Sequence, residues 1–510
     1  MKQNLLKSLE KKNPLLAFQF LTADNKERKL SDFPLPKNET EALYVIGLGP
    51  KSWQKKIMEW LEEEKNRKVY LIIDSPYYLN DLSLELLEHP QLKIGNTAIA
   101  FAWDHLYKPW ELIGGTQDKE EELATAILGV ELTLALYRDF GVPEISNVIT
   151  NLKKGDGSRK GNALAGKFQN IPAIICGAGP SLEKSLDLLK EVGDRALIFG
   201  GGSALGPLSR GNIPIHFTVA LDPEPPPERF FRQTYFEVPL FYQNQVASSL
   251  LSCHHGPKLC IGESGSFPLE KWLVEDLGLP TSDVGWNVST FATSIATLMG
   301  CNPIYFVGMD LSVSKKGSYA SGVEGKDERK NPITLTDRFG DSVTTRPDFL
   351  MAKKWLEDFS ESHMETTFIN ASEGGLPLEG IPYGKIDFYQ GTFDLFSKLH
   401  QEVLKAPLLQ LETVREKLEV LDQSLTNVQK TLVEYVEGLS QDKNVILYEC
   451  ELDEEIFFQS HLLPIWEIWK HLLQNEEVIQ AMENPMLEKK LQEILFYQQL
   501  TEKFVHERNL

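Results

Sequence analysis

The sequence has no long apolar segment. No run of about 18 consecutive apolar residues occurs in the chain, so a transmembrane helix is not expected. The amino-terminal stretch MKQNLLKSLEKKNPLLAFQFL carries charges throughout and lacks the apolar core and small-residue cleavage site of a signal peptide. We therefore expect this stretch to form an amphipathic helix, and the chain to be cytoplasmic without membrane insertion.

Basic residues are scarce relative to acidic ones. The sequence has 52 Lys and Arg against 73 Asp and Glu, which gives a formal net charge of -21. Contacts to phosphate groups along a polymer or a membrane surface need clustered Lys and Arg. A nucleic-acid partner is therefore not expected, although a local basic pocket remains compatible with this charge.

Cysteines are also few. There are five in 510 residues, scattered and odd in number, so no disulfide framework is indicated and a reducing compartment fits. Cys253, His254, His255 and Cys260 form one cluster, which is open to two interpretations. It is either a zinc site or a pair of buried thiols beside loop histidines, and its spacing matches no standard zinc module.

The length and composition indicate a soluble protein of several domains, because 42% hydrophobic and 25% charged residues are globular values. Residues 1–150 are expected to form a Rossmann-like α/β domain. LYVIGLG ends in glycines, a helical stretch follows, and KVYLIID ends at Asp74, which together predict a βαβ unit. Gly47 and Gly49 are followed by Pro50 without a third glycine, so the unit is either a cofactor site or a structural domain. Residues 118–139 are expected to form a connecting helix.

Residues 151–388 alternate strand and helix signals. IPAIICG, RALIFGG, IPIHFTVALD and NPIYFVGMD are continuous apolar runs, which suit parallel strands buried on both faces. The helical stretches between them predict a doubly wound, mostly parallel α/β domain. The stretch KKGDGSRKGNALAG, from Lys153, is polar and glycine-rich and is expected to be a linker or mobile loop. The polar, glycine-rich stretch that follows Asp310, to about residue 345, is expected to be a flexible lid or an acceptor loop.

Residues 389–510 are expected to be α-helical. Apolar residues follow a sustained heptad spacing at Leu411, Val414, Leu418, Leu421, Leu425, Val428, Leu432, Tyr435 and Leu439. A long helix with such a seam packs against another helix. Because further helices follow at once, an intramolecular bundle is favoured over a coiled-coil dimer, and this region is a candidate for protein contacts.

CGAGPSLEKSL, from Cys176 to Leu186, is the strongest motif. A buried strand ends at Gly177, Ala178 and Gly179, and Pro180 and Ser181 begin a helix. Glycines let a backbone turn tightly against a ligand, Pro suits the opening of a helix, and Ser181 can cap it. The free N–H groups and helix dipole favour phosphate, whereas the alternative is a tight turn that binds nothing.

This motif and the stretches after it resemble the motility-associated factor (Maf) glycosyltransferases. Their central domain is similar to the archaeal 6-hydroxymethylpterin diphosphokinase, called MptE-like. The matching stretches are GAGPSLEKSLDLL, IPIHFTVALDPEP, GWNVSTFATSIATLMGCNPIYFVGMDLS and NASEGGLPLEGIPY, collinear from about 171 to 385. Related sialyltransferases hold a CMP-sugar on a similar Gly-x-Gly-Pro-Ser turn.

The ends of the predicted strands supply the other candidate site residues. Asp222 and Glu224 follow the third buried strand, where a carboxylate can hold Mg²⁺ or a ribose hydroxyl, or simply cap a helix. Asp310 ends the strand IYFVGMD, and Glu373 matches a Glu-Gly-Gly pattern of the family. These acids are the candidate catalytic groups. The expected nucleotide-binding and phosphate-binding residues are Gly177, Ala178, Gly179, Pro180, Ser181, Ser203, Asn287, Ser289 and Thr290.

At the start of the helix FATSIATLM, we expect Ser289 or Thr290 to act as the N-cap. His216 stands where the family often has Asp, and we interpret it as structural. No histidine lies in a clear site motif, unlike in sialyltransferases that use one, so the sequence identifies no catalytic base.

The resemblance implies transfer of a nonulosonic, sialic-acid-like sugar from a CMP donor to Ser or Thr of a protein, with flagellin as the implied acceptor. Two alternatives stay open. One is a pterin diphosphokinase that uses ATP and Mg²⁺ in the same crevice, against which the extra terminal regions weigh. The other is a catalytically degenerate domain that acts as a binding scaffold.

Overall fold

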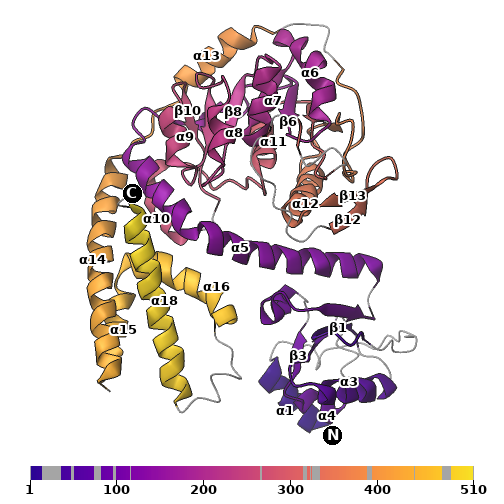
Figure 1. The fold of residues 1–510 in the computed structure, drawn as a ribbon, viewed down its shortest axis with the longest axis vertical. Coiled ribbons are helices and arrows are strands. Elements are labelled where there is room, and N and C mark those ends of the chain that lie inside the picture. The colour runs from indigo at the N-terminus through magenta and orange to yellow at the C-terminus, as the bar shows by residue number, and fades with distance from the viewer. Residues whose placement is uncertain are drawn as a thin grey trace. The chain divides into compact units, whose positions relative to one another are not determined.

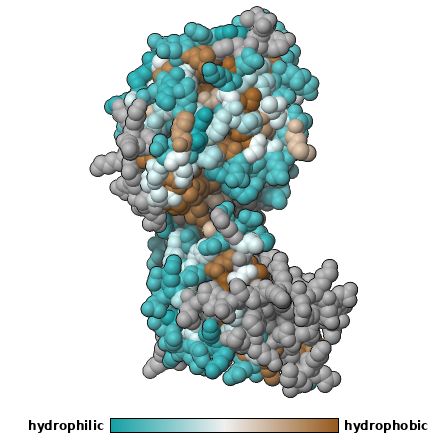
Figure 2. Space-filling model, turned by 90° about the vertical axis from the view of Figure 1, so that its right-hand side faces the viewer, coloured by the Kyte–Doolittle hydropathy of each residue, from teal (hydrophilic) through white to brown (hydrophobic). Residues whose placement is uncertain are grey.

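The computed structural model describes residues 2–13, 36–47, 51–73, 82–95, 99–114, 116–264, 267–313, 319–321, 323, 333–387, 393–441, 443–473 and 484–508. The chain divides into two compact units, Met1–Ala135 and Leu136–Leu510. The described residues contain no helix that is long and apolar enough to cross a membrane. The face shown in Figure 2 is mostly hydrophilic, with apolar residues visible between polar ones.

The first unit has a parallel four-stranded sheet in the order β3-β2-β1-β4. Its elements are α1 (Lys2–Lys12), β1 (Ala42–Ile46), α3 (Lys51–Glu63), β2 (Lys68–Ile72), α4 (Leu84–Glu88), β3 (Leu92–Gly95), a 3-10 helix (Ile99–His105) and β4 (Trp110–Ile113). The predicted βαβ unit is confirmed as β1-α3-β2. Gly49, Pro50 and Asp74, on which a cofactor role would depend, lie outside the described residues.

The second unit is built on an eight-stranded sheet in the order β14-β11-β6-β7-β8-β9-β10-β5, in which every ladder is parallel. The strands are β5 (Arg159–Lys160), β6 (Ala173–Cys176), β7 (Leu197–Gly201), β8 (Phe217–Ala220), β9 (Leu240–Tyr242), β10 (Lys258–Cys260), β11 (Ile304–Val307) and β14 (Phe368–Asn370). From β6 the chain adds strands in one direction as far as β10, and then returns to place β11 on the other side of β6. This reversal confirms the doubly wound fold and puts a topological switch point between β6 and β11.

Helices cover both faces of this sheet (Figure 1). They are the part of α5 (Gln117–Lys153) that follows Ala135, α6 (Leu182–Lys190), α7 (Leu205–Arg210), α8 (Pro227–Phe231), α9 (Ser248–Cys253), α10 (Pro268–Val274), α11 (Val288–Leu298), α12 (Pro347–Ser362) and α13 (Leu395–Lys405). Alternate residues of β6 point to opposite faces: Ala173 and Ile175 pack with α11 and α12, whereas Ile174 and Cys176 pack with α6 and α7. Burial on both faces explains the continuous apolar runs of the sequence.

One loop prediction is wrong, and one is only partly covered by the described residues. The segment from Lys153 is not a linker, because Arg159–Lys160 forms the edge strand β5 beside β10 and Gly161–Leu164 forms a 3-10 helix. The expected connecting helix is longer than 118–139 and continues as α5 to Lys153. Part of the polar stretch after Asp310 forms an antiparallel hairpin, β12 (Ile333–Thr336) and β13 (Ser342–Thr345), while residues 314–318, 322 and 324–332 lie outside the described residues.

The carboxy-terminal helices form a bundle that shares a hydrophobic core with the sheet domain. They are α14 (Glu412–Ser440), α15 (Ile446–Asp453), a π-helix (Phe458–Leu462), α16 (Leu463–Leu473) and α18 (Pro485–Arg508), and α14 lies beside α18 in Figure 1. The heptad seam of α14 is buried in the same cluster as residues of α5, α10 and α18. The intramolecular bundle is thus confirmed. The predicted boundary at residue 388 falls inside the second compact unit.

Shortening one seam residue tests this intramolecular packing. Leu421 is fully buried on α14, so Leu421→Ala removes packed methyl groups and is expected to lower the free energy of unfolding by about 2–5 kcal/mol. The control is Val420→Ala, since Val420 is 55% exposed on the same helix and should have little effect. Urea denaturation measures both changes. A variant that loses self-association, with the monomer's stability unchanged, would contradict the intramolecular seam.

Candidate functional site

The turn after β6 is hydrogen-bonded to the neighbouring strand β11. The Gly177 N–H donates to the Val307 carbonyl and the Gly179 N–H to the Gly308 carbonyl, each at 2.8 Å. The predicted phosphate turn therefore lies at the switch point, at the carboxyl ends of both strands. Two of its N–H groups are already paired within the protein.

Asp310 occupies the amino-terminal end of α6. The Ser181 N–H donates to Asp310 Oδ2 at 2.8 Å, and the Ser181 hydroxyl donates to Oδ1. Ser181 occupies the N-cap position of α6, as expected, but its side chain makes no capping hydrogen bond to the helix. Burial raises the pKa of Asp310, and the two Ser181 bonds and nearby Lys184 oppose that rise. The carboxylate thus takes the place expected for a phosphate.

Glycine is required here by the protein's own packing. A Cβ on Gly179 would lie 2.6 Å from Asp310 Cγ and 2.7 Å from the Gly308 carbonyl oxygen. Gly177 lies equally close to the backbone at Gly308. The Gly-x-Gly pattern therefore has a structural cause that needs no ligand.

The loop after β14 brings Glu373 to the edge of this turn. Glu373 is exposed and forms an ion pair with Lys184 at 3.6 Å, while the next residue, Gly374, faces Ser181 and Asp310. Arg338, at the tip of the hairpin β12-β13, donates to the Ser372 carbonyl at 2.7 Å and lies over the Tyr383 ring. The hairpin thus packs against the loop that carries Glu373.

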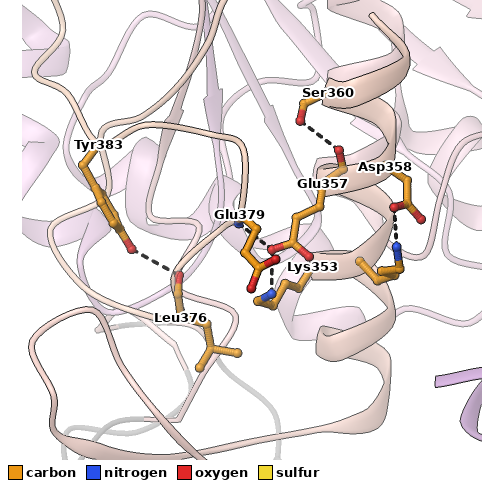
Figure 3. A network of polar contacts seen from close by, with 8 residues as sticks. Lys353, Glu357, Asp358, Ser360, Leu376, Glu379 and Tyr383 are labelled. Carbon is orange, nitrogen blue, oxygen red and sulfur yellow. Dashed lines mark hydrogen bonds and ion pairs between the residues drawn. The ribbon is translucent and has the colours of Figure 1, made fainter. Parts of the chain in front are cut away.

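Polar contacts fix the far end of this loop to α12 (Figure 3). The Glu357 carboxylate accepts hydrogen bonds from Lys353 Nζ at 2.5 Å and from the Glu379 N–H at 2.6 Å. The Tyr383 hydroxyl points to the Leu376 carbonyl at 3.5 Å. These contacts hold the loop through side chains that sequence reasoning did not identify.

The start of α11 is closed by its own capping box. The cap is Asn287, not Ser289 or Thr290 as expected, because Asn287 Oδ1 accepts from the N–H groups of both these residues at 2.9 and 3.0 Å. The Thr290 hydroxyl oxygen accepts from the Asn287 N–H in return. The side chains of Asn287 and Thr290 are thus engaged in the cap, whereas Ser289 contributes its backbone N–H to it.

A hollow lies at the carboxyl ends of β7 and β8, two strands along from β11. Gly202, Ser203, Asp222 and Val288 are among its lining residues. The structure thus brings together Ser203, Asp222 and the start of α11. Gly177–Ser181, Asp310 and Glu373 are not among the residues that line the hollow.

The mouth of the hollow is charged. Arg229 on α8 donates to the Ser203 hydroxyl at 3.3 Å and lies over the Tyr319 ring at 4.9 Å. The Asp222 side chain is in contact with solvent. The protein around its carboxyl nevertheless raises the pKa of Asp222 by desolvation, and the Glu224 N–H and the charge of Arg229 oppose that rise. An anionic group of a ligand could bind to Arg229 here, and Asp222 could accept a proton from a ligand group.

The expected Mg²⁺ site at Asp222 and Glu224 stays a prediction. The Glu224 N–H donates to Asp222 Oδ1 at 3.1 Å. Within the described ranges, no group of three or more His, Cys, Asp or Glu side chains is arranged to hold a metal ion. This also applies to the cluster from Cys253 to Cys260.

The structural role expected for His216 stays a prediction, with which the contacts of its ring agree. His216 is buried, and its Nδ1 accepts the Ile198 N–H at 3.0 Å.

Sequence reasoning missed Arg229, Tyr319 and the role of His254, which lines the inner hollow. Arg229 follows the strand end LDPEPPP, and this position could have drawn attention to it. Tyr319 comes from a remote segment, which only the tertiary fold brings near Arg229.

Comparison with known proteins agrees with this architecture. Residues 146–316, about a third of the chain, match the family model "6-hydroxymethylpterin diphosphokinase MptE-like". The solved structure of a Maf glycosyltransferase from Magnetospirillum magneticum AMB-1 aligns with a TM-score of 0.53 and 14% identity, over 92% of this chain and 78% of that one. The fold is that of a Maf glycosyltransferase. No curated protein sequence matches significantly.

The resemblance expected from the sequence is thus confirmed for the Maf fold and for the MptE-like central segment. The alignment extends well beyond the stretches 171–385 that carried the resemblance in the sequence. At 14% identity the likeness concerns the fold alone, because one fold hosts many chemistries.

A pair of glycine substitutions tests the packing of the Ser181–Asp310 turn. Gly179→Ala places a methyl group against Asp310 and Gly308, so it should lower the free energy of unfolding by about 1–3 kcal/mol. Gly374→Ala is the matched control, because its methyl group would make ordinary contacts at 3.6 Å to Ser181 and 3.8 Å to Asp310. Thermal and urea unfolding without ligand compare the two. Equal stabilities would show that the turn does not pack as described.

Proposed function

We propose that the chain is a glycosyltransferase that moves a nonulosonic sugar from a CMP donor to a Ser or Thr hydroxyl of a protein, with flagellin as the acceptor that the family resemblance implies. A cytoplasmic location is part of this proposal. The observation that carries it is the hollow beside β7 and β8, which combines a cation, a carboxylate and an apolar interior. Ligands of open α/β sheets bind at this edge.

Arg229 is the group that would hold the donor phosphate. Its guanidinium already bonds to Ser203, at the start of the helical segment after β7, so the two can share an anionic ligand. Gly202 has a φ of 48°, which lets the backbone pass close to the hollow. Stabilising the phosphate charge as CMP leaves is the electrostatic part of catalysis.

Asp222 would act as the general base. In the transfer, the acceptor oxygen forms a bond to the anomeric carbon, the bond from that carbon to the CMP phosphate breaks, and the hydroxyl proton passes to Asp222. A raised pKa makes the ionised carboxylate a stronger base than a solvated Asp. Asp310 would position the neighbouring turn through Ser181, and Glu373 remains a candidate acid at its exposed edge.

A pterin diphosphokinase that uses ATP and Mg²⁺ is the second candidate, because the matching family model carries that activity in its name. Thermal unfolding with CMP, UMP, and ATP with Mg²⁺ separates the two. At about 100 times its dissociation constant, a ligand adds about 2.7 kcal/mol of stability. Stabilisation by CMP supports the transferase, whereas stabilisation by ATP and Mg²⁺ alone supports the kinase. CMP binding without transfer would indicate a scaffold.

Arg229→Ala tests the phosphate contact. Loss of one charge-assisted hydrogen bond is worth about 1.5–3 kcal/mol, so the affinity for CMP should fall roughly 10- to 150-fold by calorimetry. Arg232→Ala is the control, since Arg232 is exposed and does not line the hollow. If folded Arg229→Ala binds CMP as tightly as the unaltered protein, the phosphate lies elsewhere.

Asp222→Asn tests the base. The amide cannot take the hydroxyl proton, so kcat for transfer to a Ser- or Thr-containing protein should fall roughly 10²- to 10⁴-fold, while CMP affinity changes little. In the unaltered protein, activity should be lost as pH falls through the pKa of Asp222, which burial places above the ordinary value. Unchanged kcat in the variant would remove Asp222 from the mechanism.

A further inference from the structure

The inner part of the hollow is apolar except for one histidine. Leu205, Val219, Leu240 and Leu250 line it together with His254, which follows α9. His254 is only 4% exposed. A buried imidazole in an apolar wall needs a hydrogen-bond partner for each ring nitrogen, or a reason to lack one.

One nitrogen of His254 has a partner and the other does not. The ring is hydrogen-bonded to the Val238 backbone, and burial, the largest cause, lowers its pKa to about 4. The imidazole is therefore neutral near pH 7. Because Nε2 has no partner, the bond to Val238 belongs to Nδ1, which carries the proton. Nε2 is then a lone-pair acceptor without a donor.

The other polar side chains of the inner wall are occupied. The Tyr235 hydroxyl donates to the Ile213 carbonyl at 2.7 Å, the Thr218 hydroxyl donates to the Pro239 carbonyl, and the Gln233 side chain accepts the Tyr235 N–H. Among the described residues that line the hollow, His254 Nε2 is the buried side-chain atom left without a partner. An unpaired acceptor in an apolar wall is suited to a flat ligand that carries an N–H on its edge.

We propose that the inner hollow binds the nucleobase of the donor, and that His254 Nε2 accepts a hydrogen bond from an exocyclic amino group such as that of cytosine. This inference rests on the proposed function and adds to it the residue that selects the base. Uracil carries a carbonyl oxygen where cytosine carries the amino group. Two lone pairs would then face each other, so His254 should reject uridine nucleotides.

The first test changes only the ligand, so it does not depend on the folding of a variant. Calorimetry on the full chain compares CMP, UMP and N4,N4-dimethyl-CMP, which keeps the ring but lacks the amino hydrogens. CMP should bind at least about tenfold more tightly than either of the other two, the difference that one hydrogen bond supplies. Equal binding of CMP and its dimethyl derivative would overturn the proposal.

The second test changes the acceptor. In His254→Gln, the amide oxygen can take the place of Nε2, so the preference for CMP over UMP should be largely kept. His254→Leu fills the space without an acceptor, and the preference should disappear while both nucleotides still bind. The control is His255→Ala, since His255 is exposed beside it and should leave the preference unchanged. Loss of preference in the control but not in the Leu variant would overturn the assignment.

Failure of this inference and failure of the proposed function give different results. If no cytidine nucleotide binds the unaltered protein, both fall. If CMP binds but the dimethyl derivative and His254→Leu leave the CMP-to-UMP ratio as it was, His254 does not select the base, and the transferase proposal stands without it.

Discussion

The carboxylate of Asp310 closes the amino-terminal end of α6, and this contact ties the turn after β6 to the segment after β11. The return of the chain to β11 beside β6 places Asp310 next to Ser181, which donates two hydrogen bonds to it. A helix start is an attractive place for an anion, and here the protein supplies the anion itself. The same close packing requires glycine at positions 177 and 179, because a Cβ there would meet the segment from Gly308 to Asp310.

The hollow at this edge of the sheet lies at the carboxyl ends of β7 and β8. The hollow there has a charged mouth, with Arg229 and Asp222, and an apolar interior that ends at His254. Such a division matches the two ends of a nucleotide, because a phosphate needs a cation and a base needs a flat apolar space. The capping box at Asn287 already uses the Ser289 and Thr290 N–H groups at the nearby α11 start, and Arg229 and Ser203 are the groups proposed to meet the phosphate.

Much of the fold could be predicted from the sequence, whereas the partners of the site residues could not. Continuous apolar runs indicated the buried parallel strands, and the spacing from Leu411 to Leu439 indicated the bundle, because both follow from local periodicity. Ser181 illustrates the limit: its type and position suit a helix cap, but its hydroxyl bonds to Asp310, 129 positions away. Likewise, the Lys153 segment appeared polar and loop-like, because only a pairing with distant β10 turns two of its residues into a strand. His254 appeared to be a possible zinc ligand until the hollow showed what surrounds it.

The central claim is that a CMP-linked donor binds in the hollow at the ends of β7 and β8, with its phosphate at Arg229. A crystal structure of the chain with CMP tests this claim most directly. The account predicts the phosphate against Arg229 and Ser203, the base inside the hollow, and the Ser181–Asp310 bonds intact. Nucleotide bound instead over Gly177–Ser181, with Asp310 displaced from the start of α6, would contradict it.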